Sequence, residues 1–476
     1  SRPPMTRFSR LFLFGFVSLF WCSCQPEERF AWSPDGNYAA VIINDQLHLA
    51  DATGRLVAAR HNEAGKEEEN DVRKVEWLPD GGGLVMHEIK VFRDWNILRD
   101  QLPEEEVKAV EALTVNMPQR IESAAILLGS DAELGDLISR LSLESKVVNL
   151  SAFQLACSLD RAAIEVALKD SPSARAQLEK IDEGSPGFPV HEISIELLDP
   201  DRTRFVESRP VLRSLRGIQG LALAPDGKSV AVEWQTEHPE RFDLEIVGLA
   251  NGSRREIAKG ITSAFAWSPD GESLVFLESL SAQGGHLMRL MWQSLKAAGD
   301  AETRSLATVL IPFAPRVVVL PDNSVLFAGQ PIILPASGRD PERQPRLFLL
   351  SLPDAEIREV FTPPGSLPMD LGSFVPSPDG SKVAIVESGS DAVAIVNLET
   401  GSSELLGDSH PGWKCRTLPA WRTSNALTYA VLAKNGEQID WILREEDGET
   451  HRLSAAWPKG ATSGWLEWRQ GNDPTP

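Results

Sequence analysis

The sequence has few cysteines, no long apolar run and no excess of bases, and each shortage excludes a class of protein. Four cysteines in 476 residues are too few for a disulfide framework. The longest apolar run, residues 11–21, is about half of what a bilayer-spanning helix needs. The chain has 47 bases against 68 acids and a net charge of -21, which argues against nucleic acid as a partner because phosphates bind clustered cations.

Signatures of catalysis are also missing. The sequence has no Gly-x-Ser-x-Gly nucleophile elbow, no His-Glu-x-x-His, no P-loop and no dinucleotide fingerprint. The eight histidines are scattered singly along the chain. We therefore expect no catalytic residue, no cofactor and no metal site. Residues gathered from distant repeats would leave no sequence spacing, so an enzyme remains the alternative.

The N-terminus has the order of charges and apolar residues that is typical of a signal peptide. Arg7 and Arg10 precede the apolar run, and a polar stretch follows it. We expect residues 1–24 to be this signal, with the natural start at Met5. An uncleaved anchor is the alternative that the short run leaves open.

This leader resembles that of bacterial lipoproteins, in which a cysteine after a small residue becomes the lipidated first residue. Cys24 follows Ser23 and fits that rule. Cys22 is the alternative, because Leu19 stands three residues before it. The resemblance implies a membrane-anchored lipoprotein of the bacterial periplasm, at either the inner or the outer membrane. A plain cleaved leader remains the second possibility.

Two cysteines remain beyond the leader, Cys157 and Cys415. Neither lies in a zinc-binding spacing. They are either two buried thiols or one disulfide, which an oxidising envelope would permit.

A five-residue pattern recurs along the chain. Trp32-Ser33-Pro34-Asp35-Gly36 returns as Trp267-Ser268-Pro269-Asp270-Gly271, and a degenerate copy ends at Asn425. Apart from the degenerate copy there are six, and the pairs that close them are Asp35 and Gly36, Asp80 and Gly81, Asp226 and Gly227, Asp270 and Gly271, Asp322 and Asn323, and Asp379 and Gly380. Proline, aspartate and a residue that tolerates positive φ make a tight turn, so these residues have a structural role in hairpins.

Strand-like stretches follow each turn, and most copies are spaced by 44 to 57 residues. A unit of this length is typical of a four-stranded propeller blade. The fold class is therefore all-β, a β-propeller in which seven turns favour seven blades, with six or eight possible. The segment at residues 465–469 is expected to close the ring, or else to be a tail.

The repeats resemble the Trp-Ser-Pro-Asp-Gly propellers of the TolB family and WD40-like rings, over residues 29–100 and 190–470. The resemblance implies a fold far more than a function, because prolyl-oligopeptidase-type peptidases carry the same ring. The chain departs from TolB, which has an α/β domain before its propeller.

One spacing, of 146 residues, is too long for a single blade. Within it, Pro103 precedes three glutamates and apolar residues recur with helical period. We predict blades 1 and 2 at residues 29–102, an inserted bundle of four or five helices at 103–187, and the other blades at 188–470. The insertion is either a partner-binding or lid element, or a tolerated passenger.

These observations favour a non-catalytic scaffold of the cell envelope. We expect it to bind a protein partner through a propeller face or the insertion, and to meet the membrane only through the lipid anchor. The alternative is a propeller enzyme, a polysaccharide hydrolase or lyase or a peptidase-like protein, with its site in the central channel.

Overall fold

The structure is a computed structural model of the chain. It describes residues 28–60, 70–115, 117–128, 136–137, 159, 161–179, 187–236, 238, 240–280, 286–296, 302–311, 315–330, 346–352, 356–362, 369–387, 392–407, 413–415, 417–433, 439–462 and 466–468. The predicted leader with Cys22 and Cys24, and Cys157, lie outside the described residues.

Consecutive strands pair antiparallel and group into four-stranded units. The first unit has β1 (Phe30–Trp32), β2 (Tyr38–Ile43), β3 (Gln46–Asp51) and β4 (Leu56–Ala59). The second has β5 (Asn70–Trp77), β6 (Gly83–Phe92), β7 (Phe188–Leu198) and β8 (Phe205–Ser214). The third has β9 (Ile218–Leu223), β10 (Ser229–Gln235), β11 (Phe242–Gly248) and the first half of β12 (Arg254–Trp267). The long β12 continues as the first strand of the fourth unit.

The remaining units repeat this plan. The fourth adds β13 (Ser273–Ser279), β14 (Leu287–Ser294) and β15 (Thr303–Leu310). The fifth has β16 (Val317–Val319), β17 (Val325–Gly329), β18 (Arg346–Ser351) and β19 (Glu356–Phe361). The sixth has β20 (Met369–Pro376), β21 (Lys382–Glu387), β22 (Val393–Asn397) and β23 (Ser403–Leu406). The seventh has β25 (Ala420–Trp421), β26 (Leu427–Leu432), β27 (Ile439–Arg444) and β28 (Thr450–Arg452).

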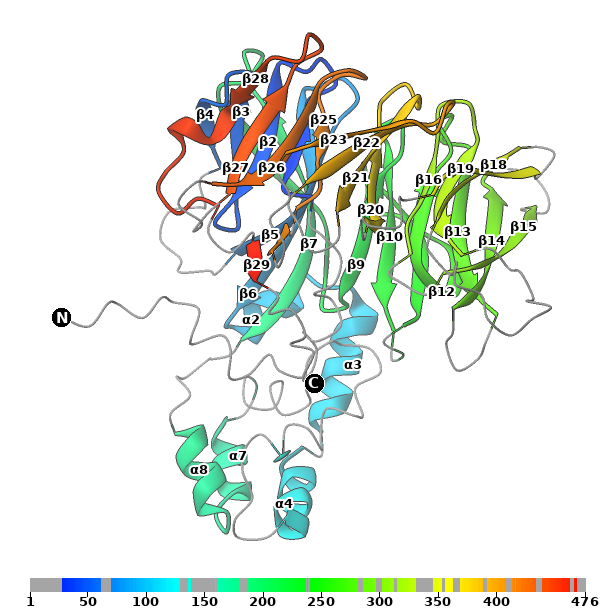
Figure 1. Ribbon diagram of the computed structural model, residues 1–476. Helices are drawn as coiled ribbons and strands as arrows, with labels where there is room; N and C mark the ends of the chain where they lie inside the picture. Colours follow the sequence, from blue (N-terminus) through cyan, green and yellow to red (C-terminus); the bar gives the residue numbers. More distant parts are fainter. Residues whose placement is uncertain are drawn as a thin grey trace, which may run out of the picture.

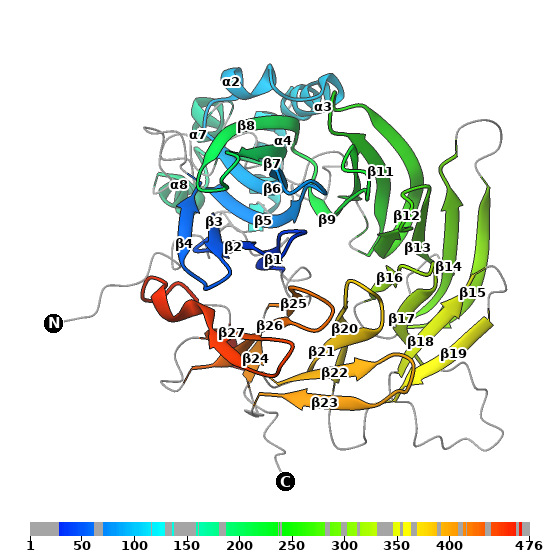
Figure 2. The same ribbon diagram turned by 90° about the horizontal axis from the view of Figure 1, so that it is seen from above.

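The units stand side by side in a ring around a central axis, and the first strand of each unit lies innermost (Figure 2). A separate apolar core lies between every two successive units, including the seventh and the first. The predicted β-propeller is confirmed. The described strands make seven units, one for each turn of the repeat.

The repeat residues form the turn between the first and second strands of their units. Six turns place their fifth residue at positive φ, between 66° and 71°: Gly36, Gly81, Gly227, Gly271, Asn323 and Gly380. In the first turn the carboxylate of Asp35 accepts bonds from the Ser33 hydroxyl at 2.6 Å and the Asn37 N–H at 3.1 Å. The aspartate is therefore used in fixing the hairpin.

Each repeat tryptophan donates its indole N–H to the preceding unit. These bonds join Trp32 to Thr428 Oγ1 (2.9 Å), Trp77 to the Ala31 carbonyl (2.9 Å), Trp267 to the Ala222 carbonyl (3.0 Å), and Trp421 to the Val375 carbonyl (2.9 Å). The first of them crosses from the last unit to the first. The motif therefore both turns the chain and attaches neighbouring units.

The expected ring-closing strand takes a different position. β29 (Leu466–Trp468) pairs with β24 (Trp413–Cys415), which precedes the seventh unit, and not with β1. The first unit already has four strands of its own, so no place is left for a shared one. The ring closes through side chains instead. After the short helix η2 (Leu453–Ala456), Trp457 donates its indole N–H to the Gly54 carbonyl at 2.8 Å.

The helical insertion lies within the second unit, between β6 and β7 (Figure 1). The prediction that blade 2 ends before residue 103 is therefore wrong, because β7 and β8 complete it after the helices. The described helices are α2 (Trp95–Arg99), α3 (Glu104–Thr114), α4 (Met117–Leu128), α7 (Arg161–Ala167) and α8 (Pro172–Leu178). In the described part of the chain, no helix has the length and apolarity to span a bilayer.

Candidate functional site

Charged side chains from distant units meet at the innermost strands of the ring. Glu28 precedes β1, Lys74 lies on β5, and Arg316 precedes β16. The Glu28 carboxylate lies 3.3 Å from Lys74 Nζ and 3.2 Å from Arg316 Nη2. One carboxylate therefore connects the first, second and fifth units.

This cluster neutralises itself. The nearby Lys74 ammonium lowers the pKa of Glu28 to about 2, against the opposing effect of burial and with further help from Arg316. Burial disfavours the charged form of Lys74, but the carboxylates of Glu28 and Glu76 raise the pKa of Lys74 overall. Glu76 lies 3.0 Å from the Lys74 ammonium and accepts the Leu223 N–H at 2.8 Å. Both carboxylates are thus paired with the Lys74 ammonium.

A protonated carboxyl group lies next to this cluster. Glu233, on β10, is 2% exposed, and burial raises its pKa to about 8. Its Oε2 accepts the Ser263 hydroxyl at 3.0 Å, and its Oε1 has no hydrogen-bond partner among the described residues. Gly220 leaves room for it, because a Cβ there would meet Glu233 Oε2 at 2.6 Å. The group is neutral at pH 7 and can donate a proton.

Two histidines meet between the second and third units. His87 Nε2 lies 2.9 Å from His191 Nδ1, which also accepts the Ile218 N–H at 3.2 Å. Burial lowers the pKa of both rings, that of His191 to about 3. Both are therefore neutral at pH 7, and His87 donates to His191. The bond between the two rings lies within the second unit, and the Ile218 N–H joins His191 to the third.

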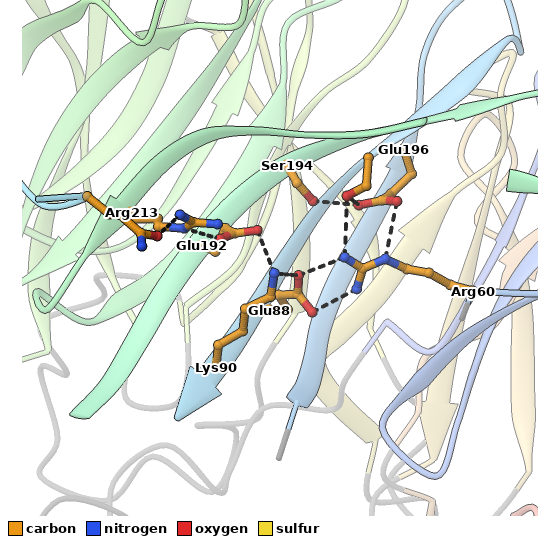
Figure 3. Close-up of polar contacts among 9 residues, drawn as sticks. Arg60, Glu88, Lys90, Glu192, Ser194, Glu196 and Arg213 are labelled. Carbon is orange, nitrogen blue, oxygen red and sulfur yellow. Dashed lines mark hydrogen bonds and ion pairs between the residues drawn. The ribbon is translucent and has the colours of Figure 1, made fainter. Parts of the chain in front are cut away.

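A larger network of ions lies between the first two units (Figure 3). Arg60, after β4, forms a bidentate pair with Glu88 on β6 at 2.8 and 3.0 Å. Its Nε lies 3.2 Å from Glu196 on β7. Lys90 joins Glu88 at 3.0 Å to Glu192 at 2.8 Å. Three carboxylates and three cations balance once Arg213 is included.

The network continues into the helical insertion. Arg213, on β8, pairs with Glu192 and donates to the side chain of Gln101, which follows α2. Glu106, on α3, is 2% exposed and accepts the Ser214 hydroxyl at 2.6 Å. It also accepts the Leu215 N–H at 2.7 Å. These contacts fix the base of the insertion on the propeller.

The far part of the insertion exposes apolar side chains. Val115, Ile126, Leu127 and Val166 are 72, 72, 70 and 69% exposed, more than any other large apolar residue described. Below them α4, α7 and α8 have a core of their own, which includes Ile121. The four exposed residues are not part of that core. We call the four exposed residues the insertion's apolar surface.

The predicted turn residues stay apart from these clusters. The carboxylate of Asp35 pairs with Arg202 at 2.7 Å, and Asp322 accepts the Ser324 hydroxyl at 2.5 Å. Among the described residues no group of three or more possible metal ligands occurs. Cys415 lies on β24, and Cys157 lies outside the described part, so the choice between two thiols and a disulfide stays a prediction.

The sequence analysis did not predict the cluster around Lys74, although the repeat contains a signal for it. Glu28 and Ser263 stand four residues before a repeat tryptophan, Lys74 stands three before, and Arg316 stands three before Val319, which holds the tryptophan position. Polar residues at these positions are unexpected for the first strand of a buried blade. Reading the repeat backwards from the turn would have found them.

No protein-family model matches the chain, and no curated protein matches it. Solved structures do. TolB from Acinetobacter baumannii is 17% identical and matches over 81% of this chain and 79% of its own, with a TM-score of 0.40. The Cps50 (Swd1) β-propeller domain of Myceliophteria thermophila is 10% identical over 86% of this chain and 94% of its own, with a TM-score of 0.43.

An enzyme is among the similar structures. An oligogalacturonate lyase in complex with manganese is 18% identical over 56% of this chain and 73% of its own, with a TM-score of 0.39. The predicted TolB-like propeller thus agrees with the structures found, and the strand pairing described above establishes the ring. Similarity at this level carries no information on activity.

Proposed function

We propose that this chain is a non-catalytic propeller of the bacterial cell envelope that binds a protein partner through its helical insertion. The observation that carries this proposal is the insertion's apolar surface. A docking surface needs exposed apolar side chains, and this small, separately packed helical unit has four that are about 70% exposed. The propeller is the rigid support that presents it.

The pairing of charges supports a role without catalysis. A glycosidase needs two free carboxyl groups flanking its substrate. Here Glu28 and Glu76 share the Lys74 ammonium. Glu88 and Glu192 share Lys90. The carboxyl groups of these two clusters are thus held in ion pairs, as a structural role requires.

We further propose that lipidation at Cys24, or alternatively at Cys22, anchors the chain in the periplasm. The acidic composition supports an anchor of this kind, because an anionic membrane surface repels a chain with net charge -21. Membrane attachment then depends on the lipid.

The test is capture of envelope proteins by the full chain and by a variant in which a Gly-Ser linker replaces residues 115–180. This variant keeps α2 and α3, which pack on the propeller through Trp95 and Val110. Circular dichroism and the thermal midpoint verify that its ring is intact. We expect the variant to lose specifically captured proteins. An unchanged set of partners contradicts the proposal.

Glu233 is the one observation that favours the alternative, a propeller enzyme. Its protonated carboxyl group could act as a general acid. The comparison of wild type with Glu233→Gln on polygalacturonate and on unsaturated or acetylated polysaccharides tests this directly. Turnover by wild type that Glu233→Gln abolishes would establish the enzyme.

A further inference from the structure

Glu28 holds the start of the described chain at the innermost strands of the ring. Its carboxylate contacts Lys74 of the second unit and Arg316 of the fifth. The next residue, Arg29, accepts the Ile42 N–H through its carbonyl at 2.9 Å, and its side chain lies 3.6 Å from Asp45. Ionic contacts and a backbone hydrogen bond to three units therefore fix the point at which the N-terminal segment leaves the ring.

Only three residues separate Glu28 from Cys24. Four extended steps of the backbone reach about 14 Å. With a lipid on Cys24, Glu28 would therefore stay within about this distance of the bilayer surface, and a lipid on Cys22 would add about 7 Å. A tether this short determines which face of the ring turns to the membrane.

Strand direction places the insertion on that same face. From Glu28 the chain runs along β1 toward the repeat turn, so Glu28 lies at the end away from the turns. β6 starts after the turn at Gly81 and runs the opposite way, so it ends beside Asn70, at the start of β5. The insertion follows, and Figure 1 shows α4, α7 and α8 beyond this face.

The insertion is longer than the tether. Helix α3 has 11 residues and α4 has 12, which correspond to about 16 and 18 Å. Because α4, α7 and α8 lie beyond the face that this tether would hold within about 14 Å of the bilayer, the insertion would lie in the layer next to the membrane. The insertion's apolar surface is part of this layer.

The charge of the insertion favours a protein over lipid as the partner of its apolar surface. Glu122 and Glu165 are each paired with a base, Lys169 at 3.8 Å and Arg161 at 3.2 Å. Residues 103–183 as a whole nevertheless contain 15 acids against 8 bases, so the insertion has a net negative charge. Anionic headgroups repel such a surface. We propose that the insertion's apolar surface docks on a protein embedded in the same membrane, at the level of the headgroups. This rests on the proposed partner-binding function and on the lipid anchor.

The test is photo-crosslinking of the full, lipidated chain in its own membranes. p-Benzoylphenylalanine replaces Leu127 in one variant and Lys228 in the other. Lys228 is 82% exposed in the turn that follows Gly227, on the opposite face of the ring. We expect Leu127→p-benzoylphenylalanine to form an adduct with a protein that stays in the membrane during alkaline carbonate washing. Lys228→p-benzoylphenylalanine forms none.

A further variant has its leader exchanged for one that is cleaved before Gln25, which leaves no lipid. We expect its adduct at position 127 to fall at least tenfold. An adduct with a protein that carbonate removes, or one at position 228 instead, overturns the inference and leaves partner binding intact. Adducts with lipid alone, or none at either position, overturn the partner itself.

Discussion

The buried ion network between the first two units predicts a large loss of stability when its central cation is removed. Arg60 is 11% exposed and pairs with Glu88 and Glu196, whose side chains are 0 and 1% exposed. In Arg60→Leu, Glu88 keeps Lys90, but Glu196 keeps only hydroxyl donors among the described residues. A buried carboxylate without a cation is costly, because its solvation by water is not replaced.

Breaking a buried pair in this way costs about 3–5 kcal/mol. Since Lys90 still neutralises Glu88, we expect the lower end, about 3 kcal/mol, for Arg60→Leu. Urea unfolding followed by tryptophan fluorescence at pH 7 measures it. The double variant Arg60→Leu with Glu196→Leu should recover at least half of the loss, because it no longer buries the unpaired charge.

The matched control is an exposed pair in the same unit. Arg55 is 75% exposed and lies 3.1 Å from Asp51. Arg55→Leu should cost less than about 1 kcal/mol. A loss in Arg60→Leu no larger than in this control would refute the reasoning, as would a double variant that is less stable than Arg60→Leu alone.

Three other predictions concern single groups. The folded chain keeps a proton on Glu233 up to about pH 8, whereas an unfolded glutamate loses it near pH 4.5. The free energy of unfolding should therefore fall as pH rises between these values, and Glu233→Gln should remove this fall in urea titrations at a series of pH values. Gly227→Ala should destabilise more than Gly448→Ala by thermal unfolding, because both have positive φ but only the Cβ at 227 would meet Pro79, at 2.7 Å. Glu106→Ala should speed proteolytic cleavage within the insertion, because it frees α3 from the propeller.

Local chemistry explains why the sequence predicted the ring. The turn residues act within five positions, so Asp35 and Gly36 show their hairpin without knowledge of the rest of the fold. The helical period in the insertion is equally local. The place where the insertion enters the ring is not set by local sequence, because β6 and β7 pair across about 100 intervening residues. Nothing in either strand alone tells which one is its partner.

The charge clusters could not be predicted from the sequence for the same reason. Glu28 and Arg316 are 288 residues apart in the chain and meet only because the ring closes. Glu88 and Glu192 each follow a histidine in the sequence, and successive side chains lie on opposite faces of a strand. The adjacent histidines do point the other way, and they meet each other. Register between β6 and β7 decides both pairings, and it is a property of the folded sheet.

The most direct test of the central claim is the affinity of the captured partner for the insertion's apolar surface. Kd is measured for wild type and for the chain with Ile126→Ser, Leu127→Ser and Val166→Ser. The control carries Val206→Ser, Ile357→Ser and Leu405→Ser, which remove three exposed apolar side chains from the outer strands of the propeller. We predict that Kd rises about a hundredfold in the first variant, or about 3 kcal/mol, and stays unchanged in the control. An unchanged Kd in the first variant, or equal losses in both, would contradict the account.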